Sequence, residues 1–213
     1  MPVPTLHYRL CATKKRAPAG VVLLLGLIGV CAIAVAAPSE PQALVEEVVA
    51  NLYEQLRTTD FNEETAVSDM IRLFESEVAR HIDFTVIARW IVGQDWMHSS
   101  AMERERFVMA LKGYIIKTYA VAFARGKDSL IELSDTVKIR ETRALVNGTL
   151  LTINGQVMQL QFRLIRDAKT WKIIDIAIDG ISLSRTLRSE LQSTLRSGGI
   201  VVASSLLENR LAK

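Results

Sequence analysis

The sequence has few of the residues that carry covalent or metal chemistry. Its 213 residues include two cysteines, Cys11 and Cys31, and both lie within the first 36 residues. The chain from residue 37 onward therefore has no thiol. This absence excludes disulfides, zinc thiolate sites and cysteine catalysis from that part of the protein.

Only two histidines, His81 and His98, lie outside the first 36 residues, and neither belongs to an HExxH motif. A metal site built on them would need carboxylates from elsewhere, so we interpret both as polar residues at helix ends. The segment Gly180-Ile181-Ser182-Leu183-Ser184 lacks the second glycine of a nucleophile elbow, and no histidine follows it. The sequence thus predicts no catalytic residue, no metal and no cofactor. Ser182 or Ser184 is predicted to cap a helix beginning near Arg185.

Residues 1–36 have the three parts of a cleavable secretory signal. A basic head precedes an apolar stretch from Val21 to Val35, and small residues end it at Ala34-Val35-Ala36. The apolar stretch is about fifteen residues, shorter than the roughly twenty that span a membrane. We predict export and a single mature domain over residues 37–213, with a retained membrane anchor as the alternative.

The charge of the predicted mature domain is close to zero. The whole chain has 26 basic and 23 acidic residues, and four of the basic ones lie in the signal, which leaves 22 basic residues against 23 acidic ones. A formal charge near −1 provides no electrostatic basis for binding nucleic acid. The domain is long enough to bury a sizeable core.

The first part of the mature domain is predicted to be helical, because its apolar residues recur at helical spacing. Asp83 can cap the third helix and Gly93 can end it. Ser100 and Glu103 form a capping box before the longest helix. The expected helices cover residues 41–57, 65–80, 84–92 and 101–125.

After Gly126 the apolar pattern changes to the period of two that is typical of strands. Asn154-Gly155 predicts a tight hairpin turn. Two helices, residues 185–196 and 200–212, are expected after the sheet, separated by Gly198-Gly199. The fold class is α+β, with N-terminal and C-terminal helices packed on one face of a curved four- to five-stranded antiparallel sheet. The expected strands cover residues 130–133, 137–141, 144–153, 156–166 and 171–178.

Aromatic residues and methionines are concentrated on the middle helices, between Trp90 and Phe123. Such residues pack an ordinary core, and they equally line an adaptable apolar pocket between helices and sheet. The residue pattern leaves both interpretations open.

Three motifs occur in order along the chain. Ile91-Val92-Gly93 precedes Trp96 and a helix containing residues 103–107, and Thr118-Tyr119-Ala120 follows. The third motif joins Trp171-Lys172-Ile173-Ile174-Asp175 to residues 180–183 and Arg188. Over residues 45–207 the chain resembles the MlaC, or toluene-tolerance, family of periplasmic phospholipid-binding proteins. Departures at Gln94-Asp95 and residues 200–204 leave a hopanoid-associated branch of that family open.

The resemblance implies a periplasmic carrier, not an enzyme, with a cavity between helices and sheet that encloses acyl chains. Its expected partners are a phospholipid or a related lipid such as a hopanoid, and lipid-transport complexes of the inner and outer membranes served by an ABC system. We expect a monomer. A periplasmic enzyme using the same cavity and an envelope adaptor protein remain alternatives. The predicted lipid-binding residues are Trp90, Phe107, Leu111, Tyr114, Thr118, Leu160, Phe162, Ile174 and Ile176.

Overall fold

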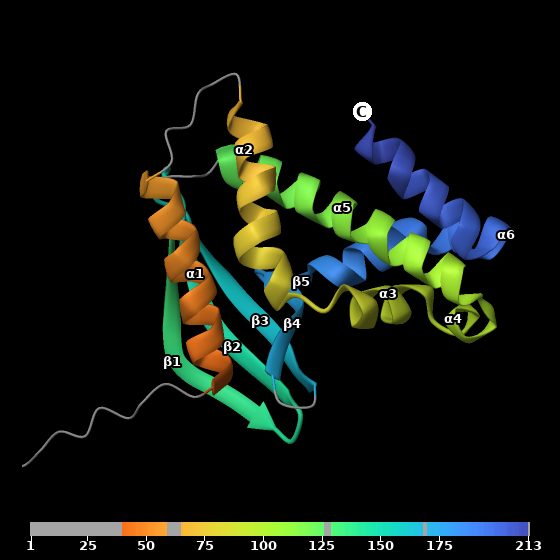
Figure 1. Cartoon of the computed structure of the whole chain (residues 1–213). Coiled ribbons are helices and arrows are strands. Elements are labelled where there is room, and N and C mark those ends of the chain that lie inside the picture. The colour runs from red at the N-terminus through yellow and green to blue at the C-terminus, as the bar shows by residue number, and fades with distance from the viewer. Residues whose placement is uncertain (1–39, 59–64, 126–128, 168–169, 213) are drawn as a thin grey trace, which may run out of the picture. The chain divides into compact units, whose positions relative to one another are not determined.

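The computed structural model describes residues 40–58, 65–125, 129–167 and 170–212. Within these ranges the chain forms helices first, an antiparallel sheet next and a long helix last (Figure 1). The α+β class and the helix–sheet–helix order predicted from the sequence are confirmed. The proposed signal, residues 1–36, lies outside the described residues.

The helical part contains more short elements than the periodicity predicts. Its α-helices are α1 (Glu40–Thr58), α2 (Ala66–Leu73), α3 (Phe84–Val92), α4 (Asp95–His98) and α5 (Ala101–Arg125). The single helix expected over residues 65–80 keeps α-helical bonding only to Leu73. It then continues as a π turn, η1 (Phe74–Val78), and a 3₁₀ turn, η2 (Ala79–His81). The one-turn helix α4 is too short for a periodic pattern to reveal.

Local capping explains why α3 and α5 have the predicted bounds. Asp83 Oδ1 accepts a hydrogen bond from the Val86 N–H at 2.9 Å, and Gly93 ends α3 with a φ of 73°. The Ser100 N–H donates to Glu103 Oε2 at 2.7 Å, and the Glu103 N–H donates to Ser100 Oγ at 3.3 Å. These bonds satisfy helix-end groups that have no partner within the helix.

Five antiparallel strands form one sheet in the order β1-β2-β3-β4-β5. The two strands expected over residues 130–133 and 137–141 are one strand, β1, because an irregularity between Leu133 and Val137 shifts the register without ending the pairing. The strand β5, only two residues long, was not predicted. The strands are β1 (Leu130–Arg140), β2 (Arg143–Leu151), β3 (Val157–Asp167), β4 (Thr170–Ile178) and β5 (Ile181–Ser182).

The last helix, α6 (Leu183–Leu211), consists of two segments joined at a kink. Gly199 has φ 63° and ψ −164°, a conformation outside the helical region that only glycine adopts readily. The kink lies where the two terminal helices were expected to separate. Ser182 caps the first segment, because its Oγ accepts the Arg185 N–H at 3.1 Å.

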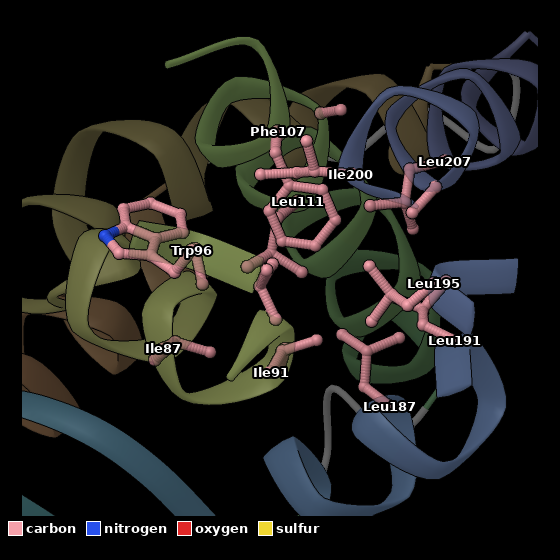
Figure 2. Packing of buried hydrophobic residues seen from close by; sticks show 14 residues of the cluster. Ile87, Ile91, Trp96, Phe107, Leu111, Leu187, Leu191, Leu195, Ile200 and Leu207 are labelled. Atoms are coloured by element: carbon pink, nitrogen blue, oxygen red, sulfur yellow. The ribbon is translucent and has the colours of Figure 1, made fainter. Parts of the chain in front are cut away.

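Among the described residues, four apolar clusters hold these layers together, and two of them are larger than the others. One core lies among α3, α4, α5 and α6 and contains Phe107, Leu111, Leu191 and Leu207 (Figure 2). The other core lies where α1 crosses one face of the sheet, as Figure 1 shows, and contains Phe162. In the described ranges, no helix is long and apolar enough to cross a membrane.

Candidate functional site

A cavity of about 300 Å³ lies between the helices and the inner face of the sheet. Almost all of its lining is aliphatic or aromatic. On the helical side the lining comes first from the N-terminal elements: Val48, Val49 and Leu52 of α1, Phe74 and Val78 of η1, Ala79 of η2, Ile82 just before α3, and Ile87 of α3. The longer helices add Ile115, Ile116, Tyr119, Ala122 and Phe123 of α5, and Leu183, Ser184 and Leu187 of α6. The sheet and its approach contribute Ser129, Ile131, Leu150, Leu160, Phe162, Ile173, Ile174, Asp175, Ile176 and Ile178.

The strand register explains why the sheet wall is apolar. Ile131 pairs with Leu150 on β1 and β2, so both side chains lie on the same face of the sheet. Phe162 pairs with Ile176 on β3 and β4 and extends this face. On β1, β2 and β3 the intervening residues point to the other face, which removes polar residues such as Gln161 from the cavity.

The helical wall depends on one stripe of α5. Ile115, Ile116, Tyr119 and Phe123 recur at the spacing that aligns side chains along one face of a helix. At the end of this stripe the Phe123 ring packs edge-on against Phe74, with ring centroids 5.5 Å apart. The π turn η1 is thereby joined to the end of α5, where it forms part of the cavity wall.

Asp175 is the one carboxylate in the lining, and its oxygens are already engaged. Its side chain is 5% exposed and accepts the Ser182 hydroxyl at 2.6 Å and the Ser184 N–H at 3.0 Å. Arg163 Nη1 lies 3.5 Å from the same carboxylate. Asp175 therefore holds the start of α6 against β4.

Tyr119 adds a hydroxyl to a lining that is apolar apart from Ser129, Ser184 and Asp175. Burial, with smaller contributions from Tyr114, Asp175 and Glu190, raises the pKa of Tyr119 to about 12. The group is therefore neutral at physiological pH and able to donate or accept a hydrogen bond. The cavity can thus enclose a long apolar group and offer it one neutral polar contact.

The structure places the predicted lipid-binding residues in two groups. Leu160, Phe162, Ile174 and Ile176 line the cavity, all from β3 and β4. Ile174 does so at the register shift of β4, where it is the extra residue between two paired positions.

The other five predicted residues are absent from the cavity lining. Phe107 and Leu111 are fully buried in the core among α3, α5 and α6 (Figure 2). Tyr114 lies under Arg210, whose guanidinium carbon is 5.5 Å from the ring centre, and Thr118 is exposed. Trp90 is 42% exposed and stacks under Arg188 at 4.8 Å.

The two groups differ because α5 is apolar on two sides. One side packs on α3 and α6, and the stripe predicted from the sequence follows that side. The cavity uses the neighbouring stripe, which starts at Ile115. Periodicity shows that a helix has an apolar face but not which partner that face contacts. The motif Thr118-Tyr119-Ala120 and the aromatic concentration ending at Phe123 each included a cavity residue of this stripe.

Neither histidine lines the cavity. Arg80 Nε donates to His81 Nε2 at 2.9 Å, and burial together with the Arg80 charge lowers the pKa of His81. His98 is exposed at the end of α4. Across the part of the chain that the structure describes, no three His, Cys, Asp or Glu side chains gather to hold a metal ion.

Comparison with known proteins identifies similar sequences and folds. The family described as MlaC protein matches residues 46–209, which is more than half of the chain. The fold is similar to that of the phospholipid-binding protein from Ralstonia solanacearum, solved in complex with a phospholipid, with a TM-score of 0.73. That match has 21% sequence identity and covers 82% of this chain and 98% of the other.

Proposed function

This chain belongs to the MlaC family, and we propose that it is a periplasmic lipid carrier without catalytic activity. It binds acyl chains of a phospholipid, or of a related lipid such as a hopanoid, in the cavity between α5 and the sheet. As a monomer it shuttles this lipid between inner-membrane and outer-membrane complexes of an ABC-type transport system. The apolar cavity is the observation that carries the proposal.

The cavity is large enough for a long segment of an acyl chain. An apolar cavity of about 150 Å³ stays dry and accepts benzene, and this cavity is about 300 Å³. It therefore has room for roughly a dozen carbon atoms. At about 0.8 kcal/mol per buried methylene, a chain segment of that length gains on the order of 10 kcal/mol by leaving water.

The chemistry of the lining favours binding over catalysis. Asp175 is engaged by Ser182, Ser184 and Arg163, and the remaining polar groups are hydroxyls. An enzyme using this cavity needs an acid or base facing the bound molecule, and His81 and His98 lie outside the lining. An adaptor protein has no need for a hollow core.

The proposed location follows from the export signal and the family. A lipid that crosses an aqueous compartment needs its chains covered, because exposed methylenes strongly disfavour its release into water. A carrier released from its signal at residue 36 moves freely between two membranes. N-terminal sequencing of the exported protein tests cleavage at this position.

Lipid identification tests the proposal most directly. Protein purified from the periplasm of its own cells is denatured, and released lipids are identified by mass spectrometry. We expect phospholipid or hopanoid in a defined ratio to protein. Protein that carries no lipid and extracts none from vesicles would contradict the carrier function, whichever lipid is offered.

A pair of tryptophan variants tests the site itself. Ala122→Trp on α5 adds bulk at a position that lines the cavity, and we expect it to lower the lipid-to-protein ratio severalfold. Thr118→Trp, one turn earlier on α5 and outside the lining, is the matched control with the lipid load of wild type. Thermal melts confirm that both variants fold. Equal loss in both variants, or loss in the control alone, would place the lipid elsewhere.

A further inference from the structure

Exposed aliphatic side chains gather at the end of the sheet where β1 starts and β2 turns into β3. Leu130, Leu151 and Val157 pair across three strands and are 45%, 40% and 57% exposed. Ile153 in the β2–β3 turn is 68% exposed. We name these four residues the apolar tip. Side chains of this kind usually avoid water, so a cluster of them marks an interaction surface.

The apolar tip adjoins residues of the cavity wall along the chain. Ser129 and Ile131, on either side of Leu130, both line the cavity, as does Leu150 beside Leu151. Because side chains alternate along a strand, the paired tip residues lie on one face of the sheet and the cavity wall on the other. The cavity thus reaches the end of the sheet at which the tip is exposed.

The β2–β3 hairpin, which contains three of the four tip residues, has a long stretch without charged residues. Residues 144–162 contain no Asp, Glu, Lys, Arg or His, although 23% of the chain is charged and a stretch of this length would carry about four such residues. Charged groups strongly disfavour entry into the apolar part of a bilayer. A protein-binding surface, in contrast, normally has a polar rim with complementary charges. The absence of charge favours a lipid surface as the partner.

The turn at the tip satisfies its own backbone. The Thr152 N–H donates to the Gln156 carbonyl at 2.9 Å, and the Gly155 N–H donates to the Thr152 carbonyl at 2.8 Å. The Gln156 N–H donates to Thr152 Oγ1 at 3.1 Å. Unpaired backbone groups oppose transfer from water to lipid, and these bonds remove much of that opposition.

The start of β1 is held just as firmly. The Tyr53 hydroxyl donates to the Ser129 carbonyl at 2.8 Å and accepts the Ile131 N–H at 2.8 Å. Burial raises the pKa of Tyr53, which keeps its hydroxyl proton in place for this bond. These two bonds hold the backbone on either side of Leu130, so its exposed side chain keeps a defined position.

Among the residues that the structure describes, two carboxylates beside the tip limit how deep it can go. Asp179 is exposed and accepts the Gln159 N–H at 2.7 Å, and Glu132 is exposed on β1 two residues beyond Leu130. Both carboxylates stay in the headgroup layer if only the tip enters the membrane. This geometry is that of a shallow, interfacial contact.

We propose that the apolar tip inserts into the interfacial layer of a lipid bilayer, so that lipid passes between the membrane and the cavity at this end of the sheet. The proposal rests on the proposed carrier function. Because the contact is hydrophobic and the tip is uncharged, it does not depend on anionic lipid. Raising the salt concentration should therefore leave it unchanged.

The test measures transfer of a fluorescent phosphatidylcholine between vesicles of unlabelled phosphatidylcholine, with no other protein present. In Ile153→Asp/Val157→Asp we expect the rate to fall at least tenfold at both low and high salt, since aspartate resists membrane entry. The conservative variant Ile153→Leu/Val157→Leu keeps the tip apolar and should transfer lipid at the wild-type rate. The matched control is Met102→Asp/Met109→Asp on α5, where both methionines are more than half exposed. It should transfer at the wild-type rate.

The lipid load of the purified proteins separates this proposal from the carrier function. The aspartate tip variant should melt like wild type and keep its co-purified lipid, because its substitutions lie outside the cavity. Transfer at the wild-type rate by this variant would overturn the membrane contact while the carrier function stands. Lipid-loaded wild type that fails to exchange with protein-free vesicles would also overturn it, in favour of a protein partner. A wild type without lipid would contradict the carrier function instead.

Discussion

Replacing Asp175 with alanine tests whether the junction between β4 and α6 depends on one buried carboxylate. Asp175 accepts the Ser182 hydroxyl at 2.6 Å and the Ser184 N–H at 3.0 Å, with Arg163 at 3.5 Å. Ser182 in turn accepts the Arg185 N–H and caps α6. The substitution therefore removes the carboxylate and loosens the cap that it holds in place.

The expected loss follows from these contacts. A hydrogen bond to a charged group contributes about 1.5–3 kcal/mol, so two of them give roughly 3–6 kcal/mol. Removing one member of a buried charge pair costs a similar ~3–5 kcal/mol. These estimates describe the same contacts and are not added. For a domain of this size, each kcal/mol shifts the midpoint of thermal unfolding by about 2–4 °C.

Urea unfolding of residues 37–213, followed by circular dichroism, measures the difference. Asp175→Asn keeps an acceptor for the Ser184 N–H and should lose about half as much as Asp175→Ala. Asp167→Ala, an exposed aspartate at the end of β3, is the matched control and should stay within about 0.5 kcal/mol of wild type. An Asp175→Ala variant as stable as that control would refute the reasoning.

Three further predictions concern other positions. The raised pKa of Tyr119, about 12 against a usual value of 10, keeps the folded state protonated where the unfolded state ionises, so stability falls from pH 10 to 12. After allowance for solvent screening, wild type should lose about 1 kcal/mol more than Tyr119→Phe in urea titrations over this range. Gly199→Ala should cost about 1–3 kcal/mol in urea unfolding, because the kink needs a positive φ. Tyr53→Phe should lose about 1–3 kcal/mol and speed hydrogen exchange of the Ile131 amide, since two bonds at β1 vanish. Unchanged values in any of these measurements would contradict the corresponding contact.

Short-range signals predicted the elements that depend on neighbouring residues. The bounds of α3 and α5 were correct because Asp83, Gly93, Ser100 and Glu103 act within one turn of the helix ends. Elements that depend on distant partners were predicted less well. The register shift in β1 and the short strand β5 exist only through pairing with β2 and β4.

The predicted site residues fall into those on strands, which line the cavity, and those on helices α3 and α5, which do not. Leu160 and Phe162 line the cavity because their strand has one polar face, and its opposite, apolar face is covered by the helices. On α5 the prediction followed the stripe through Leu111, whereas the cavity uses the stripe through Ile115. Both stripes are apolar, so the sequence contained no local signal for choosing between them.

The sequence by itself determined the α+β class, the order of elements, the family resemblance and the absence of thiol chemistry beyond residue 36. These properties depend on composition, on periodicity and on motifs read along the chain. Only the tertiary structure decided where the cavity lies and which face of α5 lines it. It also decided that Asp175 accepts a hydrogen bond from Ser182 at the start of α6. The physical reason is that a cavity is what packing leaves unfilled. It belongs to several elements at once, and the pattern of any single element cannot specify it.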